Sequence, residues 1–144
     1  MSWLWTSGEL LTPNGAVLAV AQNNSLYCDR QEILLESSSG GTFYLRGTVS
    51  DGRMFYLRQA GLTTSRLDVN CDGREYRAER IKPLRRARRI LRVDDGAEVL
   101  HTDPRLRAGE LQVSQVESQL SLVDAAFITW GCVLLDAPDT QVRI

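Results

Sequence analysis

Residues 120–135 read LSLVDAAFITWGCVLL, and this stretch decides the fold. Ser121, Asp124 and Thr129 are its clearly polar residues. Ser121 followed by Asp124 resembles a capping box, and an acid in the first turn suits the helix dipole. Pro138 follows shortly after the apolar run, which is where helices commonly stop. The pattern therefore predicts a helix over 120–135 that is apolar nearly all round.

Such a helix is either fully buried in the protein or placed in a membrane. Its sixteen residues, at about 1.5 Å each, span roughly 24 Å, which is short of the ~30 Å hydrocarbon core of a bilayer. Asp124 would add a further cost in that setting. We therefore expect a buried helix, with a membrane segment as the alternative. Because a closed barrel surrounds a helix on every side, the all-round apolarity indicates a barrel.

The rest of the chain consists of short β-like runs separated by turns. In the run from Thr42 to Val49, Phe43, Leu45 and Gly47 alternate with polar residues, as in a half-buried strand. Four dipeptides suit tight hairpin turns, namely Asn14-Gly15, Asp51-Gly52, Asp72-Gly73 and Asp95-Gly96. Ten runs are expected to be strands: Ala16–Val20, Ser25–Cys28, Glu32–Glu36, Thr42–Val49, Arg53–Arg58, Ser65–Val69, Arg74–Glu79, Ala87–Val93, Ala97–His101 and Gly109–Val116. Further edge pieces are expected near Trp3–Leu11 and Gln141–Ile144.

The fold class expected from these patterns is mainly β. We predict one domain over residues 1–144, a closed antiparallel barrel of about 10–12 strands around a C-terminal hydrophobic helix near 120–135. The 144 residues are 43% hydrophobic and 24% charged, as in ordinary globular proteins. The net charge of −1 gives the molecule as a whole no attraction to nucleic acids or membranes, so any such binding depends on how the charges are distributed.

This layout resembles a known family. Phe43-Tyr-Leu-Arg-Gly47, Arg89-Ile-Leu-Arg-Val-Asp-Asp-Gly96 and the apolar stretch 120–135 carry a likeness to the tubby-like barrel superfamily, which includes tubby C-terminal domains, phospholipid scramblases and plant LURP-one-related proteins. The resemblance implies about a dozen strands wrapped around a central hydrophobic helix. It lies in layout: no tubby phosphoinositide-contact set and no scramblase calcium segment is matched, so no site residue is carried over.

The strongest candidate site is the basic segment Arg80–Arg92, RIKPLRRARRILR, which holds seven of the seventeen basic residues and no acid. Its candidate anion-binding residues are Arg80, Lys82, Arg85, Arg86, Arg88 and Arg92. Such a cluster can bind the phosphates of anionic lipid or of nucleic acid. The structural alternative is a solvated face paired with nearby acids. We predict an exposed patch at a barrel rim, with Arg88, Ile90 and Arg92 on one strand face.

Other polar groups give weaker signals. His101 with Asp103, Cys28 and Asp29 lacks the spacing of a nucleophile and base, and His101–Pro104 is interpreted as a turn after a strand. Asp94-Asp95 with Asp72 or Asp51 is explained by hairpin turns without calcium. Trp3 and Trp5 are either an interface anchor or a packed strand end.

The three cysteines and the single histidine point to no disulfide and no structural metal. Cys28, Cys71 and Cys132 are odd in number and contain no Cys-x-x-Cys pair, so we expect buried free thiols. The N-terminus lacks the pattern of a secretory signal, and we expect a cytoplasmic protein that can associate with a membrane surface.

The sequence contains no recognisable catalytic motif and implies no cofactor. It predicts a non-enzymatic binding or regulatory module, with an anionic phospholipid or another protein as partner and no transmembrane segment. Nucleic-acid binding, small-ligand binding by a barrel pocket, and a small enzyme with an unrecognised site are the alternatives.

Overall fold

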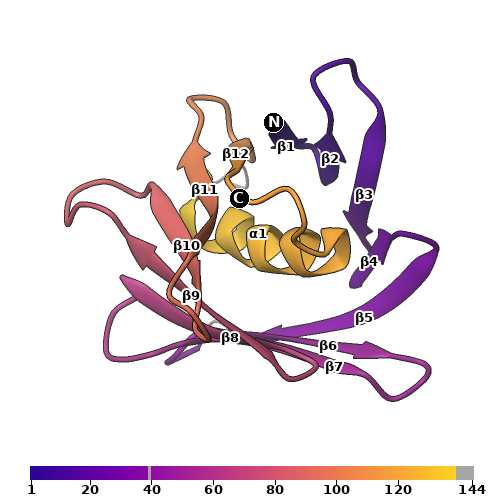
Figure 1. Ribbon diagram of the computed structural model, residues 1–144, viewed down its shortest axis with the longest axis horizontal. Coiled ribbons are helices and arrows are strands. Elements are labelled where there is room, and N and C mark those ends of the chain that lie inside the picture. Colours follow the sequence, from indigo (N-terminus) through magenta and orange to yellow (C-terminus); the bar gives the residue numbers. More distant parts are fainter. Residues whose placement is uncertain (39, 139–144) are drawn as a thin grey trace.

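The computed structural model describes residues 1–38 and 40–138, which form twelve β-strands and one α-helix (Figure 1). The strands are β1 (Ser2–Thr6), β2 (Glu9–Leu11), β3 (Val17–Gln22), β4 (Ser25–Cys28), β5 (Gln31–Ser38), β6 (Tyr44–Val49), β7 (Met54–Gln59), β8 (Arg66–Cys71), β9 (Arg74–Arg80), β10 (Arg88–Arg92), β11 (Glu98–Pro104) and β12 (Leu111–Gln115). The helix is α1 (Leu122–Asp136). Each predicted run overlaps one strand, and Trp3–Leu11 supplies β1 and β2. The edge piece predicted at Gln141–Ile144 lies outside the described residues.

Every strand pairs antiparallel with its neighbours in sequence, and β1 pairs with β12 to close the barrel. Trp3 lies opposite Val113 and Trp5 opposite Leu111 in this closing ladder. The predicted closed antiparallel barrel with a C-terminal helix is therefore confirmed. Within the described residues, no helix is long and apolar enough to cross a bilayer.

The hairpin turns follow from residues that accept positive φ. Asp72 and Gly73, between β8 and β9, have φ values of 52° and 99°. Both central residues of this turn are thus left-handed, which matches the twist of the flanking strands. Because the strands run alternately up and down, six connections lie at the end of the barrel where α1 begins and six at the end where it finishes.

The helix starts and stops where the sequence predicts. The Ser121 hydroxyl accepts a hydrogen bond from the Asp124 backbone N–H at 3.3 Å, and the helix finishes at Asp136, two residues before Pro138. Gly131 allows α1 to approach β7 closely, because a Cβ there would lie 2.6 Å from the Leu57 side chain.

The core forms between α1 and the inward faces of the strands. Phe127 packs against Phe55 of β7 with ring centroids 5.4 Å apart, and Trp5 packs against Trp130 at 5.1 Å. The Trp5 indole N–H also donates to the Thr129 hydroxyl at 2.7 Å. Figure 1 shows α1 inside the ring of strands. Trp3 and Trp5 are both buried, so they form a packed strand end and not an exposed anchor.

Two expectations need correction. The helix is not buried on every side, because Leu134 is 44% exposed and Trp130 is half-buried beside a cavity bounded by Gln22–Ser25 and Leu35. This cavity lies at the rim of the closed barrel, between the β3–β4 turn and the second half of β5. His101–Pro104 is not a turn but the second half of β11, because it pairs in register with Leu111–Ser114 of β12.

Candidate functional site

The basic segment does not form one patch, because its six candidate residues point to three different places. Arg88 lies inside the barrel, Arg80 is largely covered, and Arg92 lies on the side where α1 begins. Lys82, Arg85 and Arg86 are exposed on the β9–β10 loop.

Arg88 is fully buried, and the prediction that it lies on the surface is wrong. Its Nη2 donates to Asp136 Oδ1 at 3.0 Å and to the Thr64 carbonyl at 2.6 Å, and its Nε donates to Asp136 Oδ2. The alternation of β10 places Arg88 and Ile90 on the same inward face. Burial disfavours the charged guanidinium, yet the bonds to Asp136 hold the pKa of Arg88 above its ordinary value. Arg88 is thus a structural residue that joins β10 to the last turn of α1.

Arg80 and Arg92 are also engaged within the protein. Arg80 Nη2 lies 3.5 Å from Asp136 Oδ1 and 3.1 Å from the Thr64 hydroxyl. Arg92 pairs with Glu117 through both terminal nitrogens, at 2.5 and 2.8 Å, and with Asp95. Hydrogen bonds from Arg92 lower the pKa of Glu117 and of Asp95. These two arginines therefore hold local structure together instead of presenting free charge.

The exposed members of the segment gain neighbours from the β11–β12 loop. The β9–β10 loop is closed by the Ile81 N–H, which donates to the Ala87 carbonyl at 3.2 Å. In the next loop the Arg105 N–H donates to the Glu110 carbonyl at 3.0 Å, and Arg105 and Arg107 are exposed.

Both loops are also attached to the chain at the end of α1. Arg86 Nη1 lies 3.5 Å from the Asp136 carbonyl, and the Gly109 N–H donates to the Pro138 carbonyl at 2.7 Å.

We call this end of the barrel, where α1 finishes, the basic end. Its six connections carry one acid, Glu110, and five basic residues: Lys82, Arg85, Arg86, Arg105 and Arg107. With the acids of residues 1–38 and 40–138, none of these five forms an ion pair. These exposed side chains therefore carry charges that no acid of the described residues neutralises.

We call the opposite end, where α1 begins, the acidic end. Its six connections carry two basic residues, Arg30 and Arg53, and six acids: Asp29, Asp51, Asp72, Asp94, Asp95 and Glu117. The net charge of −1 thus conceals a separation of charge along the barrel. This separation follows the dipole of α1, whose first turn favours acids and whose last turn favours bases.

Sequence reasoning found the β9–β10 loop but missed Arg105 and Arg107. The available signal was topological: in an up-and-down barrel every second hairpin lies at the same end, so the β11–β12 loop has to join the β9–β10 loop. That signal could be used only if every strand had been counted correctly.

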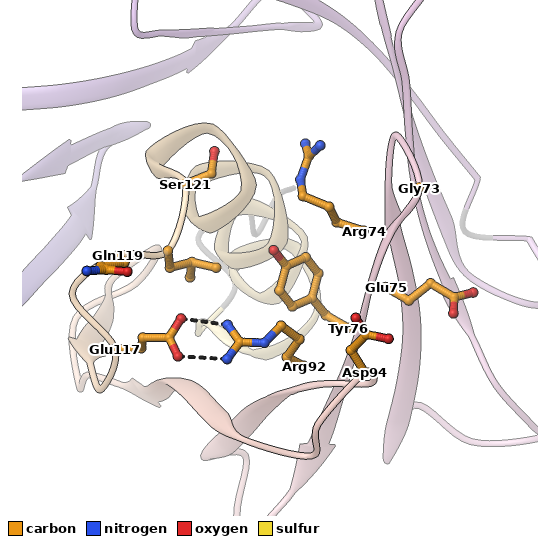
Figure 2. Close-up of a pocket in the computed structure, with 10 residues that line it drawn as sticks. Gly73, Arg74, Glu75, Tyr76, Arg92, Asp94, Glu117, Gln119 and Ser121 are labelled. Atoms are coloured by element: carbon orange, nitrogen blue, oxygen red, sulfur yellow. Dashed lines mark hydrogen bonds and ion pairs between the residues drawn. The ribbon is translucent and has the colours of Figure 1, made fainter.

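A polar cavity of about 360 Å³ opens at the acidic end, beside the first turn of α1 (Figure 2). Arg74 donates from Nε and Nη2 to the two carboxylate oxygens of buried Asp124, at 2.7 and 2.9 Å. The Tyr76 hydroxyl donates to the same carboxylate at 2.7 Å. Burial and this bond raise the pKa of Tyr76, so the phenol keeps its proton. In Figure 2, Tyr76 stands between Arg74 and Arg92. Asp124 neutralises the charge of Arg74, and Glu117 neutralises that of Arg92. We therefore interpret these residues as a structural network.

The residues considered for catalysis are not brought together. His101 and Asp103 belong to β11, whereas Cys28 and Asp29 belong to β4 and the turn after it, and these strands are not neighbours in the barrel. Burial raises the pKa of the Cys28 thiol to about 11 and that of Cys132 to about 12. All three cysteines are free and buried, so reactive thiolates are disfavoured. In the described part of the chain, no group of three His, Cys, Asp or Glu side chains could hold a metal ion.

Comparisons of the chain with protein-family models, with curated proteins and with solved structures find no match. The architecture therefore rests on the strand pairing alone: a closed twelve-strand antiparallel barrel whose C-terminal helix contacts the barrel strands.

Proposed function

We propose that this protein is a non-enzymatic module that binds anionic membrane surfaces through its basic end. The observation that carries the proposal is the set of exposed basic side chains on two adjoining loops, each lacking an ion-pair partner among the described residues. In an anionic leaflet, each lysine or arginine near the surface contributes about 1 kcal/mol of attraction. Peripheral association with a cytoplasmic membrane surface follows as part of the proposal.

The charge separation supports a defined orientation. An anionic surface attracts the basic end and repels the acidic end, and both effects act over roughly 8–10 Å at physiological ionic strength. We therefore expect the barrel axis to lie perpendicular to the membrane plane, with the basic end against the membrane and the polar cavity beside Arg74 facing the solution.

The layout also supports membership of the tubby-like barrel superfamily as a proposal. Twelve antiparallel strands closed around a C-terminal helix correspond to what that resemblance implies. The lipid-binding proposal does not depend on this resemblance, because the proposal is argued from the exposed basic residues of this chain.

Two other functions receive less support. The loops 60–65, 81–87 and 105–110 contain no aromatic residue on which nucleic-acid bases could stack. A ligand inside the barrel would compete with α1, whose residues Ala125–Thr129 are buried in the core.

The proposal is tested by sedimentation with vesicles of phosphatidylserine and phosphatidylcholine over a series of salt concentrations. Replacing Lys82, Arg85 and Arg107 by serine is expected to weaken binding about 100-fold, from about 1 kcal/mol per residue. The matched control removes the same charge elsewhere, with Arg30→Asn, Arg46→Ser and Arg53→Ser, and is expected to bind nearly as the unchanged protein does. Failure of the unchanged protein to bind at low salt, or tighter binding to RNA than to these vesicles, contradicts the proposal.

A further inference from the structure

The most exposed large apolar side chains of the described chain all lie at the basic end. Leu62, Leu84 and Leu106 are 99%, 98% and 102% exposed, whereas the next, Met1, is 76% exposed and Leu34 is 59% exposed. The three leucines lie on three different loops, one each on β7–β8, β9–β10 and β11–β12. Single exposed leucines are ordinary on protein surfaces, but three nearly complete exposures on one end are a shared feature of that end.

These three loops are neighbours held by specific bonds. The Arg80 N–H donates to the Ser65 carbonyl at 2.9 Å and Arg88 Nη2 donates to the Thr64 carbonyl at 2.6 Å, which joins the first loop to the second. The second loop is bound to Asp136, the last residue of α1, and the third loop to Pro138, two residues beyond the helix. Figure 1 shows all three projecting on the side of the barrel where α1 finishes. The leucines are thus presented from a common, braced end.

Basic residues flank two of the three exposed leucines in the sequence, Leu84 and Leu106. Leu106 lies between Arg105 and Arg107, and Leu84 lies between Lys82 and Arg85 with only Pro83 intervening. An apolar tip flanked by cations matches the layering of an anionic membrane, where lipid tails lie beneath phosphate headgroups. A soluble polyanion offers phosphates but gives a leucine no apolar environment.

We propose that Leu62, Leu84 and Leu106 insert into the outer hydrocarbon layer of an anionic membrane, while the flanking basic residues contact the headgroups. This inference rests on the proposed function and adds to it: the partner is the lipid bilayer itself, bound end-on by insertion. Burying an exposed leucine in hydrocarbon is favourable and does not depend on charge, so three tips are expected to add a part of the binding that salt does not weaken.

The direct test places a tryptophan at a tip. In Leu84→Trp, fluorescence is expected to be quenched by vesicles of brominated phosphatidylcholine and phosphatidylserine, because the indole enters the layer that carries bromine. The matched control is Leu34→Trp on the outer face of β5, which is expected to show only the response of the unchanged protein. Trp3 and Trp5 are buried and Trp130 is half-buried, so the response of the unchanged protein is measured and subtracted as background.

A second test removes the apolar tips. Leu62→Ser, Leu84→Ser and Leu106→Ser together are expected to weaken vesicle binding about 1,000-fold or more while leaving binding to heparin unchanged. The matched control, Val17→Ser, Leu34→Ser and Met54→Ser, removes three exposed apolar side chains from the barrel wall and is expected to leave vesicle binding unchanged. Thermal melting of each variant verifies folding.

The outcomes separate the two proposals. If the unchanged protein binds anionic vesicles but Leu84→Trp is not quenched, or the leucine variant binds as the unchanged protein does, insertion is overturned and electrostatic binding stands. If the unchanged protein does not bind the vesicles at low salt, both are overturned.

Discussion

The two ends of the barrel use charged residues in opposite ways. At the acidic end the charges near α1 bond to one another: Arg74 and Tyr76 bond to Asp124, and Arg92 bonds to Glu117. At the basic end the charges on the loop tips have no ion-pair partner in the described residues and stand beside exposed leucines. The charges around the cavity at the acidic end are bonded within the protein, whereas those on the loop tips of the basic end are available for a partner.

The connections differ in the same way. Two-residue turns lie at both ends, such as Asp72-Gly73 at the acidic end and Asn23-Asn24 at the basic end, and the hairpin loops of the acidic end have at most five residues. The basic end carries loops of six or seven residues between β7 and β8, β9 and β10, and β11 and β12. Binding residues commonly lie on longer loops held by a rigid scaffold, so loop length and free charge identify the same end.

The largest expected effect comes from the buried pair of the basic segment. Arg88→Met leaves the Asp136 carboxylate buried without its main partner, and we expect a loss of about 3–5 kcal/mol in the free energy of unfolding, measured by urea denaturation. Replacing both residues, as Arg88→Met with Asp136→Leu, is expected to restore most of the loss. Arg85→Met, only three positions away but exposed, is the control, with a change within about 0.5 kcal/mol. Equal stability of Arg88→Met and Arg85→Met would contradict the assignment of Arg88 as a buried structural residue and Arg85 as an exposed one.

The network at the acidic end is expected to matter less, because Arg74 is half-exposed. Asp124→Asn keeps the shape of the side chain but removes the charge to which Arg74 and Tyr76 donate, and we expect a loss of about 1–3 kcal/mol. Urea denaturation measures it, with Asp94→Asn on an exposed turn as the control. A loss no larger than that of the control would show that the network at the cavity is not structural.

Membrane binding should distinguish two arginines that are seven positions apart in the sequence. Arg85→Ser is expected to weaken binding to anionic vesicles about fivefold, from about 1 kcal/mol. Arg92→Ser is expected to leave it unchanged, because Arg92 lies at the acidic end and its charge is neutralised by Glu117 and Asp95. Equal losses in sedimentation assays would mean that the segment acts by its total charge and not by the end at which each residue lies.

The smallest expected effect is a pH dependence at the acidic end. Hydrogen bonds from Arg92 lower the pKa of Glu117 and Asp95 in the folded protein, so these carboxylates stabilise the fold above their unfolded pKa values, near 4. That contribution is lost as the pH falls through the lower, folded pKa values. Urea denaturation at a series of pH values should show a shallower acid-side loss of stability in Arg92→Ser than in the unchanged protein. Identical pH profiles would show that these exposed pairs contribute nothing measurable.

Local patterns predicted much of the fold. Alternation of apolar residues placed the strands, as in Tyr44–Val49, and residues that tolerate positive φ placed the turns. Ser121 and Pro138 marked where α1 begins and stops. The predictions that were wrong depended on contacts between residues distant in the sequence. His101–Pro104 has the composition of a turn, but pairing with two neighbouring strands holds it extended.

By itself, the sequence determined a closed β-barrel with an apolar C-terminal helix, because strand period, turn chemistry and helix apolarity are local properties that neighbouring residues share. Only the tertiary structure decided the use of the basic segment. The inward turn of Arg88 depends on the register of β10 and on Asp136, which lies 48 positions away. The meeting of Leu62, Leu84 and Leu106 at one end depends on the number and direction of all the intervening strands. Charge and apolar surface act through distances in space, and in this barrel those distances are set by strand pairing and not by position along the chain.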